Sequence, residues 1–371
     1  MRDRDTELNR QDILRWLRED DPDRLRRLWT AADDLRRDTV GEAVHLRGLV
    51  EMSNHCRREC AYCGLRAPNE RVVRYRMDID EIRAAARRAA ELGFGTVVLQ
   101  SGEDPATAPD WLEGLIRDIK EETGLAVTLS VGEQPAEYLQ MWRQAGADRY
   151  LLRFETSDPE LYARLHPDRP DGLDERLGQL PLMRDMGYEI GGGVMVGLPG
   201  QTYESLARDI ELFREFDMDM VGLGPYIANP HTPLGSDEVA PPETDDQVPA
   251  TERMTCKVLA LTRLVCPEAN IPGTTALATV DTEGGRKTAL ERGANVIMPN
   301  VTPREYIRHY RIYPSKSRAR RSARPEPGWM QKRLLQIGRY ASDGPGDRVR
   351  TGRGASDRSA GTAAAAPATA S

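Results

Sequence analysis

Hydrophobic positions along the chain change repeatedly between two spacings. Short apolar runs, which are typical of buried strands, are each followed by a stretch with apolar side chains at helical spacing. The predicted strands are His45–Met52, Thr96–Gln100, Ala126–Val131, Arg149–Glu155, Glu189–Val196, Met220–Tyr226, Asn270–Ala276 and Asn295–Pro299. The predicted helices include Asp78–Leu92, Pro109–Glu122, Pro135–Ala145, Tyr203–Phe216, Glu243–Val265 and Gly284–Arg292. Because helical crossovers join parallel strands, this alternation predicts a parallel sheet.

Eight strand–helix repeats predict one α/β domain, a (β/α)8 barrel of the TIM type, over residues 41–314. An open doubly wound sheet is the alternative, but no Gly-rich phosphate loop follows the first strand. Residues 1–40 form a predicted N-terminal helical extension. Residues 315–371 are rich in Gly, Ala, Ser and Pro. We therefore expect a largely disordered C-terminal tail there, with one short helix near Trp329–Leu335.

Barrels of the TIM type place their chemistry at the C-terminal ends of the strands. The polar side chains at those ends are therefore candidate site residues: Ser53, Ser101, Thr128, Arg153, Glu155, Tyr226, Thr274, Thr275 and Asn300. Arg153 and Glu155 are two positions apart, so they face the same side of a strand. Inside a barrel these charges need to pair with each other or with a ligand, because an unpaired buried charge is costly.

The charge of the chain is unevenly distributed. The 371 residues carry a formal net charge of −7, but the segment from Ser315 onward is basic. It lacks interleaved aromatic side chains, so we expect a solubilising extension and no nucleic-acid partner. No apolar run is long enough to predict a transmembrane helix, and the charged N-terminus lacks the apolar region of a signal peptide. We therefore expect a cytoplasmic protein without a membrane partner.

Three of the five cysteines lie close together in the loop after the first strand. Cys56, Cys60 and Cys63 have the spacing C-x3-C-x2-C, and three such thiolates can ligate three corners of one 4Fe–4S cluster. No fourth cysteine is nearby, so one iron would stay open for chemistry. Three unrelated thiols and a zinc site are the alternatives, although zinc would need a fourth ligand. Cys256 and Cys266 are expected to pack in the core.

The cysteine spacing, with Tyr62 before the last cysteine, resembles the signature of the radical S-adenosylmethionine (SAM) superfamily. The resemblance implies that the open iron binds SAM and that reductive cleavage yields methionine and a 5′-deoxyadenosyl radical. The segment from Ser101 to Asp104 resembles the Gly-Gly-Glu element that contacts the SAM amino group, through Ser101 and Glu103. The glycine-rich segment with Met195 resembles the strand that lies along the adenosine. Taken alone, each segment is more often a turn than a binding site.

Longer blocks between His45 and Pro314 resemble the HydE family of FeFe-hydrogenase maturases, a relative of biotin synthase and methylornithine synthase. They include Leu99–Pro105, Ala145–Arg153, Met195–Thr202, Ile271–Thr275 and Gly293–Asn300. The resemblance implies that Glu155 contacts the SAM ribose or amino group and that Arg176 pairs with the SAM carboxylate. It implies that the barrel cavity is lined by Ser101, Thr128, Arg153, Thr274, Thr275 and Tyr306.

The same resemblance implies a small-molecule or small iron-complex substrate, namely a cysteine-bound iron carbonyl–cyanide precursor. It also implies an electron donor such as flavodoxin or ferredoxin, and other hydrogenase maturases as partners. Phe154 departs from the family, which has His there, but it should face away from the cavity between Arg153 and Glu155. No cysteine follows Pro314, so a second cluster is not expected.

Several other functions share part of this pattern. An amino-acid radical mutase like methylornithine synthase differs only in its cavity residues. A biotin synthase would need further cysteines inside the barrel, and Cys256 and Cys266 are not on predicted strands. A non-catalytic iron–sulfur carrier would have no use for Glu155 and Arg176. A zinc-stabilised barrel would leave the polar strand ends unexplained.

Overall fold

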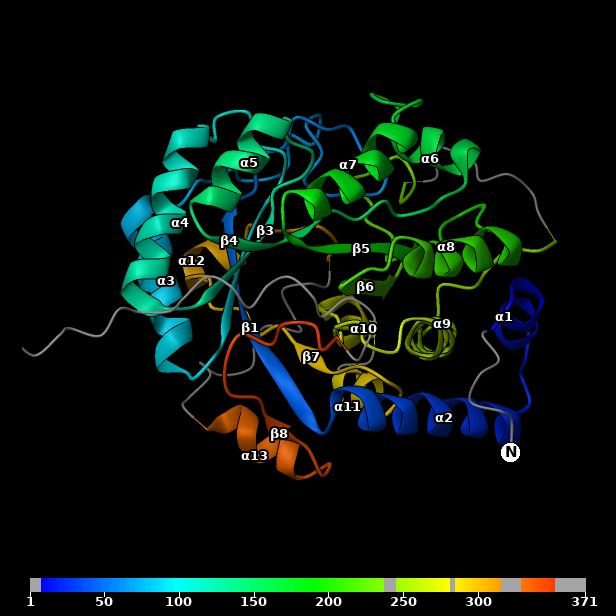
Figure 1. Ribbon diagram of the computed structural model, residues 1–371. Helices are drawn as coiled ribbons and strands as arrows, with labels where there is room; N and C mark the ends of the chain where they lie inside the picture. Colours follow the sequence, from blue (N-terminus) through cyan, green and yellow to red (C-terminus); the bar gives the residue numbers. More distant parts are fainter. Residues whose placement is uncertain (1–7, 237–244, 281–283, 315–327, 351–371) are drawn as a thin grey trace, which may run out of the picture.

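The structure is a computed structural model that describes residues 8–236, 245–280, 284–314 and 328–350. A curled parallel sheet forms its centre, with neighbouring strands in the order β6-β5-β4-β3-β2-β1-β7. The strands are β1 (Ala43–Ser53), β2 (Thr96–Ser101), β3 (Ala126–Ser130), β4 (Ala147–Leu151), β5 (Glu189–Val196), β6 (Met220–Pro225) and β7 (Val296–Ile297). Figure 1 shows the sheet wrapped by helices, so the expected TIM-type architecture is confirmed.

The two outer strands of the sheet are joined through a short extended segment. Asn270 pairs with Met220 at the start of β6, and Pro272 pairs with Val296 in β7. The predicted strand over 270–276 is therefore wrong in its extent, since only these isolated bridges form and a helix begins at Thr275. Pro272 has no N–H group, which interrupts a regular ladder at this point.

Helices cover the outside of the sheet (Figure 1). Those between the strands are α3 (Ile79–Glu91), α4 (Pro109–Thr123), α5 (Ala136–Gln144), α6 (Pro159–Leu165), α7 (Leu173–Asp185), α8 (Tyr203–Glu215), α9 (Glu252–Val265), α10 (Thr275–Val280) and α11 (Gly285–Leu290). The short α12 (Arg304–Ile307) follows β7. The predicted helix over 243–265 begins at Glu252 in the structure, and residues 243 and 244 lie outside the described residues.

The N-terminal segment contributes two helices to the outer layer. These are α1 (Arg10–Leu17) and α2 (Pro22–Val40), which pack against α8 and α9. Each begins at a side-chain cap that satisfies free backbone N–H groups: Asn9 caps α1, and Asp21 caps α2 just before a proline. Apolar side chains, Ile13 and Leu17 among them, are buried on the inner face of these helices.

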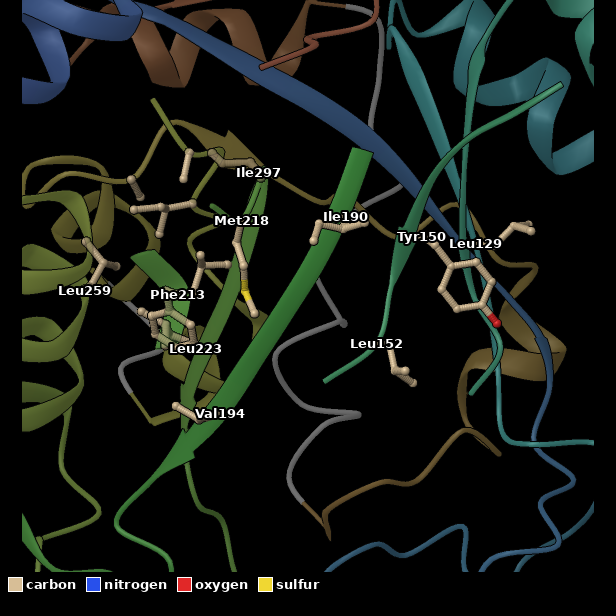
Figure 2. Packing of buried hydrophobic residues seen from close by; sticks show 14 of the residues in the cluster. Leu129, Tyr150, Leu152, Ile190, Val194, Phe213, Met218, Leu223, Leu259 and Ile297 are labelled. Carbon is tan, nitrogen blue, oxygen red and sulfur yellow. The ribbon is translucent and has the colours of Figure 1, made fainter. Parts of the chain in front are cut away.

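The core lies between the sheet and its helices. Figure 2 shows Ile190 and Val194 on β5 with Phe213 of α8 in this layer. Phe154 is fully buried there, and its ring centroid lies 6.0 Å from that of Phe213. It does not line the cavity inside the barrel, so the prediction that Phe154 faces outward is confirmed.

Residues 328–350 are the part of the expected C-terminal tail that the structure describes. The predicted short helix forms as α13 (Trp329–Leu335), and β8 (Tyr340–Ala341) pairs with the start of β1. Beyond β8, the backbone carbonyls of Pro345 and Gly346 accept hydrogen bonds from side chains at the N-terminal ends of the strands. The segment 344–350 thus covers that end of the barrel, whereas the predicted tail residues 315–327 and 351–371 lie outside the described residues.

Candidate active site

One cavity of about 350 Å³ lies inside the barrel. Twelve sequence-predicted site residues line it: Cys56, Cys60, Cys63, Ser101, Glu103, Thr128, Arg153, Glu155, Arg176, Met195, Thr274 and Thr275. Of the other strand-end candidates, Tyr226 also lines it, whereas Ser53 and Asn300 do not. The C-terminal ends of the strands therefore bring these distant side chains together, as the barrel geometry requires.

Tyr306 is the predicted cavity residue that the structure places elsewhere. Its hydroxyl donates a hydrogen bond of 2.6 Å to Glu81 on α3, and its ring packs against Tyr75. Tight turns after α12 reverse the chain, so Tyr310 is the tyrosine that reaches the cavity. The Tyr310 hydroxyl is buried and accepts a hydrogen bond of 3.0 Å from Gln100.

The cysteine loop leaves β1 and is closed by hydrogen bonds between its two ends. The Asn54 amide donates to the carbonyl of Val73 at 2.8 Å, and the Asn54 side-chain oxygen accepts from the Tyr75 N–H at 2.8 Å. Arg74 donates to the carbonyls of Asn54 and Leu65 inside the loop. These contacts hold the loop backbone, and with it the three cysteines, over the mouth of the barrel.

The chemistry and placement of the three thiols fit an iron–sulfur cluster. Burial raises the pKa of the Cys60 thiol, and the negative charges of neighbouring Cys63 and Cys56 raise it further, so the three sulfurs interact. Metal binding requires thiolates and therefore releases these protons. Within the described residues, no three His, Cys, Asp or Glu side chains surround one point closely enough for a single metal ion. A cubane differs, because each thiolate binds a separate iron.

Two buried carboxylates share a group of guanidinium ions beside the cysteines. Arg58 donates to Glu103 at 2.5 Å, and Arg176 pairs with Glu133. The Glu133 N–H donates to the Glu103 carboxylate at 3.1 Å, and Arg176 Nε donates to the carbonyl of Arg153 at 2.7 Å. These hydrogen bonds and ion pairs offset part of the cost of burying the charged groups. The site therefore offers a guanidinium and a carboxylate to a zwitterionic ligand.

Arg153 and Glu155 pair with each other at 2.8 Å. Both follow the end of β4 at Leu151, so the strand predicted over Arg149–Glu155 is too long at its C-terminal end. Glu155 has a φ of 66°, which is rare for a residue other than glycine. The N–H groups of Phe154 and Glu155 both donate to the carbonyl of Gly193 on β5, so the chain bulges there. This bulge turns the Glu155 side chain into the cavity.

The far end of the cavity is polar and closed by the C-terminal segment. The Arg47 guanidinium donates to the carbonyl of Gly346 at 3.1 Å and lies 2.8 Å from the Met220 sulfur. Burial, together with the nearby charge of Arg149, lowers the pKa of Arg47 to about 9. Thr128 Oγ1 is buried in the same region with no hydrogen-bond partner among the described residues. Polar groups that can hydrogen-bond to a ligand therefore lie at both ends of the cavity.

Several lining residues were not singled out from the sequence: Arg58, Glu133, Tyr162, His166, Asp168, Arg169 and Tyr310. Glu133 lies just after β3, so the strand-end rule could have found it. His166 follows Tyr162 by one helical turn on α6, and their ring centroids lie 4.1 Å apart. Burial lowers the pKa of His166 to about 3, so this imidazole is neutral near pH 7.

Two glycines of β5 make room for neighbouring protein atoms. A Cβ at Gly192 would overlap Met218, and a Cβ at Gly193 would overlap the backbone of Gly222. These glycines therefore let neighbouring protein atoms pack against the strand. Met195, two residues further, lines the cavity.

Comparison with known proteins identifies the class of this barrel. Residues 50–213 match the family model of the Radical SAM superfamily. The chain therefore belongs to the radical SAM superfamily, whose 4Fe–4S cluster and SAM are its cofactors.

Within the superfamily, the chain is 47% identical to the FeFe hydrogenase maturase subunit HydE of Thermotoga maritima. The similarity extends over 289 residues, which are 78% of this chain and 79% of the relative. It is 27% identical to 3-methylornithine synthase of Methanosarcina acetivorans over 310 residues, 82% of this chain and 83% of that one. The crystal structure of methylornithine synthase (PylB) has the same fold, with a TM-score of 0.77 and 24% identity over 91% of this chain and 95% of that chain. No helix among the described residues has the length and hydropathy needed to cross a membrane.

Proposed function

We propose that this radical SAM enzyme acts as a HydE-type maturase on a small substrate held deep in the barrel. The observation that carries the proposal is one continuous cavity. It joins the three cysteines and the Glu103–Glu133–Arg176 group at its mouth to Arg47, Thr128 and Asn270 at its far end. When bound, a 4Fe–4S cluster supplies the electron for reductive cleavage of SAM. The side chains of the barrel determine which ligands bind and how they are oriented.

The proposal divides the cavity between two ligands. Cys56, Cys60 and Cys63 hold the cluster, and Glu103 lies beside them to accept hydrogen bonds from the SAM amino group. Arg176 offers its guanidinium to the SAM carboxylate, and Glu155 offers its carboxylate to the ribose hydroxyls or the amino group. Met195 gives an apolar contact on the β5 side.

The substrate lies below SAM in this proposal. The hydroxyls of Thr128, Thr274 and Thr275 can donate to or accept from a small polar substrate. Apolar side chains such as Leu49, Val98 and Met298 also line the cavity and exclude water from it. A cysteine-bound iron complex has polar and apolar parts that match this mixture. An electron donor such as flavodoxin or ferredoxin, other hydrogenase maturases as partners and a cytoplasmic location rest on the family resemblance.

Anaerobic reconstitution tests the proposal. The protein is loaded with iron and sulfide, reduced and given SAM, and 5′-deoxyadenosine and methionine are measured with cysteine-type and lysine-type compounds. Stimulation of SAM cleavage by the cysteine-type compound supports the maturase function. Stimulation by the lysine-type compound alone would favour mutase chemistry, and a loaded cluster without cleavage under any condition would contradict both.

A further inference from the structure

Two segments that present proposed SAM contacts are held by a buried polar pair behind them. The bulge that carries Glu155 follows β4, and Met195 lies at the C-terminal end of β5, just before the loop that follows this strand. The backbones of the two segments meet where the Met195 N–H donates to the carbonyl of Glu155 at 3.3 Å. Because Glu155 has a positive φ, its position depends on contacts that hold this backbone from outside.

Asp209, on the inner face of α8, makes the first of these contacts. Its side chain is fully buried, and one carboxylate oxygen accepts a hydrogen bond of 2.6 Å from the N–H of Ser157. Ser157 lies two residues after Glu155, so this bond fixes the end of the bulge. The other carboxylate oxygen lies 3.5 Å from the amide nitrogen of Gln201, which donates to it.

Gln201 connects the same carboxylate to the loop after β5. Its side chain is also fully buried, and its amide oxygen accepts from the N–H of Gly197 at 2.7 Å. Its amide nitrogen donates to the carbonyl of Met195 at 3.0 Å. The two hydrogens of this nitrogen are thus used by Met195 and Asp209. This arrangement requires an oxygen acceptor at Asp209, which an asparagine amide nitrogen could not provide.

The stability of the fold alone does not explain a buried polar pair of Asp209 and Gln201. No Lys, Arg or His among the described residues forms an ion pair with Asp209, and a buried carboxylate without a cation is costly. Apolar side chains such as Leu206 and Phe213 fill the rest of this helix face. A hydrophobic residue would pack there without that cost, so the carboxylate needs a reason connected with the two segments it holds.

We propose that Asp209 and Gln201 are positioning residues that fix the bulge of Glu155 relative to Met195 at the end of β5 for SAM binding. Neither side chain lines the cavity, so the pair acts only through the backbone. The inference rests on the proposed function, because it assumes that Glu155 and Met195 contact SAM.

Asp219 provides a matched control. It is also fully buried and accepts a hydrogen bond of 2.9 Å from a backbone N–H, that of Ile190 at the start of β5. Asp219 therefore resembles Asp209 in its burial and in accepting a backbone N–H, but it lies at the opposite end of the barrel. Unlike Asp209, it also pairs with Arg184 and Arg348. A purely structural effect should appear in both Asp209→Asn and Asp219→Asn.

The experiment compares these variants as reconstituted full chains. SAM is titrated into the reduced protein while the electron paramagnetic resonance spectrum of the cluster is recorded, and KM for SAM and kcat are measured separately. Burial raises the pKa of Asp209 to about 7, so the titration is made at pH 8, where the carboxylate is ionised. Thermal unfolding of each variant reports the loss of stability.

We expect Asp209→Asn to weaken SAM binding about tenfold, as the loss of one buried hydrogen bond gives, with a smaller change in kcat. Asp219→Asn should lose thermal stability but keep the SAM affinity of the wild type. Gln201→Met should also weaken SAM binding. If Asp209→Asn does not fold, the Gln201→Met variant alone tests the inference. Unchanged affinity in the folded Asp209 and Gln201 variants, or equal losses in Asp209→Asn and Asp219→Asn, would overturn the inference. If the wild type itself shows no spectral response to SAM, the proposed function fails instead.

Discussion

The Asp104 carboxylate accepts two hydrogen bonds from the Arg76 guanidinium, at 2.7 and 2.8 Å. It also accepts one from the Ser53 hydroxyl at 2.6 Å. Ser53 ends β1 and Arg76 follows the cysteine loop, and the two pair across an antiparallel bridge. Asp104 therefore ties together both ends of the loop that carries the three cysteines.

This contact predicts a pH-dependent contribution to stability. Burial raises the pKa of Asp104, but the hydrogen bonds from Arg76 and Ser53 outweigh it and lower the pKa to about 2. The ionised carboxylate is thus favoured in the folded state, so its contribution is present above the unfolded pKa near ~4 and is lost as pH falls toward 2. We expect Asp104→Asn to lower the free energy of unfolding by about 1–2 kcal/mol at pH 7, allowing for the half-exposed Arg76.

Urea unfolding of the wild type and Asp104→Asn at a series of pH values measures this contribution. The difference should be constant from neutral pH down to roughly pH 4 and should shrink below it. Arg76→Gln should reproduce most of the effect. A difference that stays constant down to pH 2.5 would show that the carboxylate does not stabilise the loop through its charge.

Gly132 and Gly124 allow a test of the Glu103 position. Both have positive φ, but a Cβ at Gly132 would overlap the Glu103 side chain, whereas a Cβ at Gly124 meets nothing within 4 Å. Each Ala variant should cost about 1 kcal/mol of stability through backbone strain. Only Gly132→Ala should also weaken SAM binding, by about tenfold, because it displaces Glu103. Equal SAM titrations for the two variants would show that Glu103 is not needed there.

Variants of Cys60 and Cys256 distinguish a cysteine that binds the cluster from one that packs in the core. Cys60→Ala should abolish cluster loading and SAM cleavage, since a cubane held by two thiolates loses a ligand. Cys256 is fully buried on α9, so Cys256→Ala should cost about 1–2 kcal/mol of stability and keep both activities. Iron content and 5′-deoxyadenosine yield are the measurements. A normal cleavage rate in Cys60→Ala would end the cluster assignment.

Tyr310 and Tyr306 test which tyrosine belongs to the cavity. Tyr310→Phe leaves the Gln100 amide, which lines the cavity, without its acceptor at 3.0 Å, so it should lower turnover several-fold. Tyr306→Phe removes a bond to Glu81 outside the barrel and should change stability by about 1 kcal/mol or less, without a change in turnover. Steady-state kinetics with a stimulating substrate distinguish them. A larger loss of turnover in Tyr306→Phe than in Tyr310→Phe would contradict the placement of Tyr310 in the cavity.

The contacts of residues 344–350 predict how truncation of the C-terminus changes stability. A chain that ends at Arg350 keeps every described contact, and we expect it to be as stable as the full chain. A chain that ends at Ser342 loses the carbonyl of Pro345 and the Asp347 carboxylate, both partners of Arg149. Weakening a fully buried arginine in this way should cost about 3 kcal/mol or more. The measurement is the midpoint of thermal unfolding of the two truncated chains. Equal midpoints would show that residues 343–350 do not stabilise the barrel.

The sequence predicted most of the sheet because parallel strands with helical crossovers leave a strong hydrophobic pattern. It missed the short pairing at Asn270 and Pro272, where apolar composition suggested a longer strand. It also missed the return of residues 344–350 to the barrel. That segment is rich in Gly and polar residues like a flexible tail, and its partners Arg47 and Arg149 lie far away in the sequence.

The site was predicted where a rule connects sequence to geometry. Strand ends and cysteine spacing located the cavity-lining positions, and residue alternation placed Phe154 outside. Tyr306 was misplaced because the turns between it and Tyr310 have no period from which a direction can be read. Asp209 was not found because a single acid on an amphipathic helix looks like a surface residue until the packing of α8 is known.

The pairing of β1 with β8 has a consequence for the synthesis of this protein. The cysteine loop leaves the ribosome soon after β1, but β8 and the segment that covers the lower end of the barrel follow much later. At about 5–20 residues per second, roughly 15 to 60 seconds separate the two events. During that interval the three thiols have been made, but the barrel on which their loop rests is not yet closed at its other end. The nascent chain, rather than the folded enzyme, is therefore the form in which these thiols are least protected from oxidation.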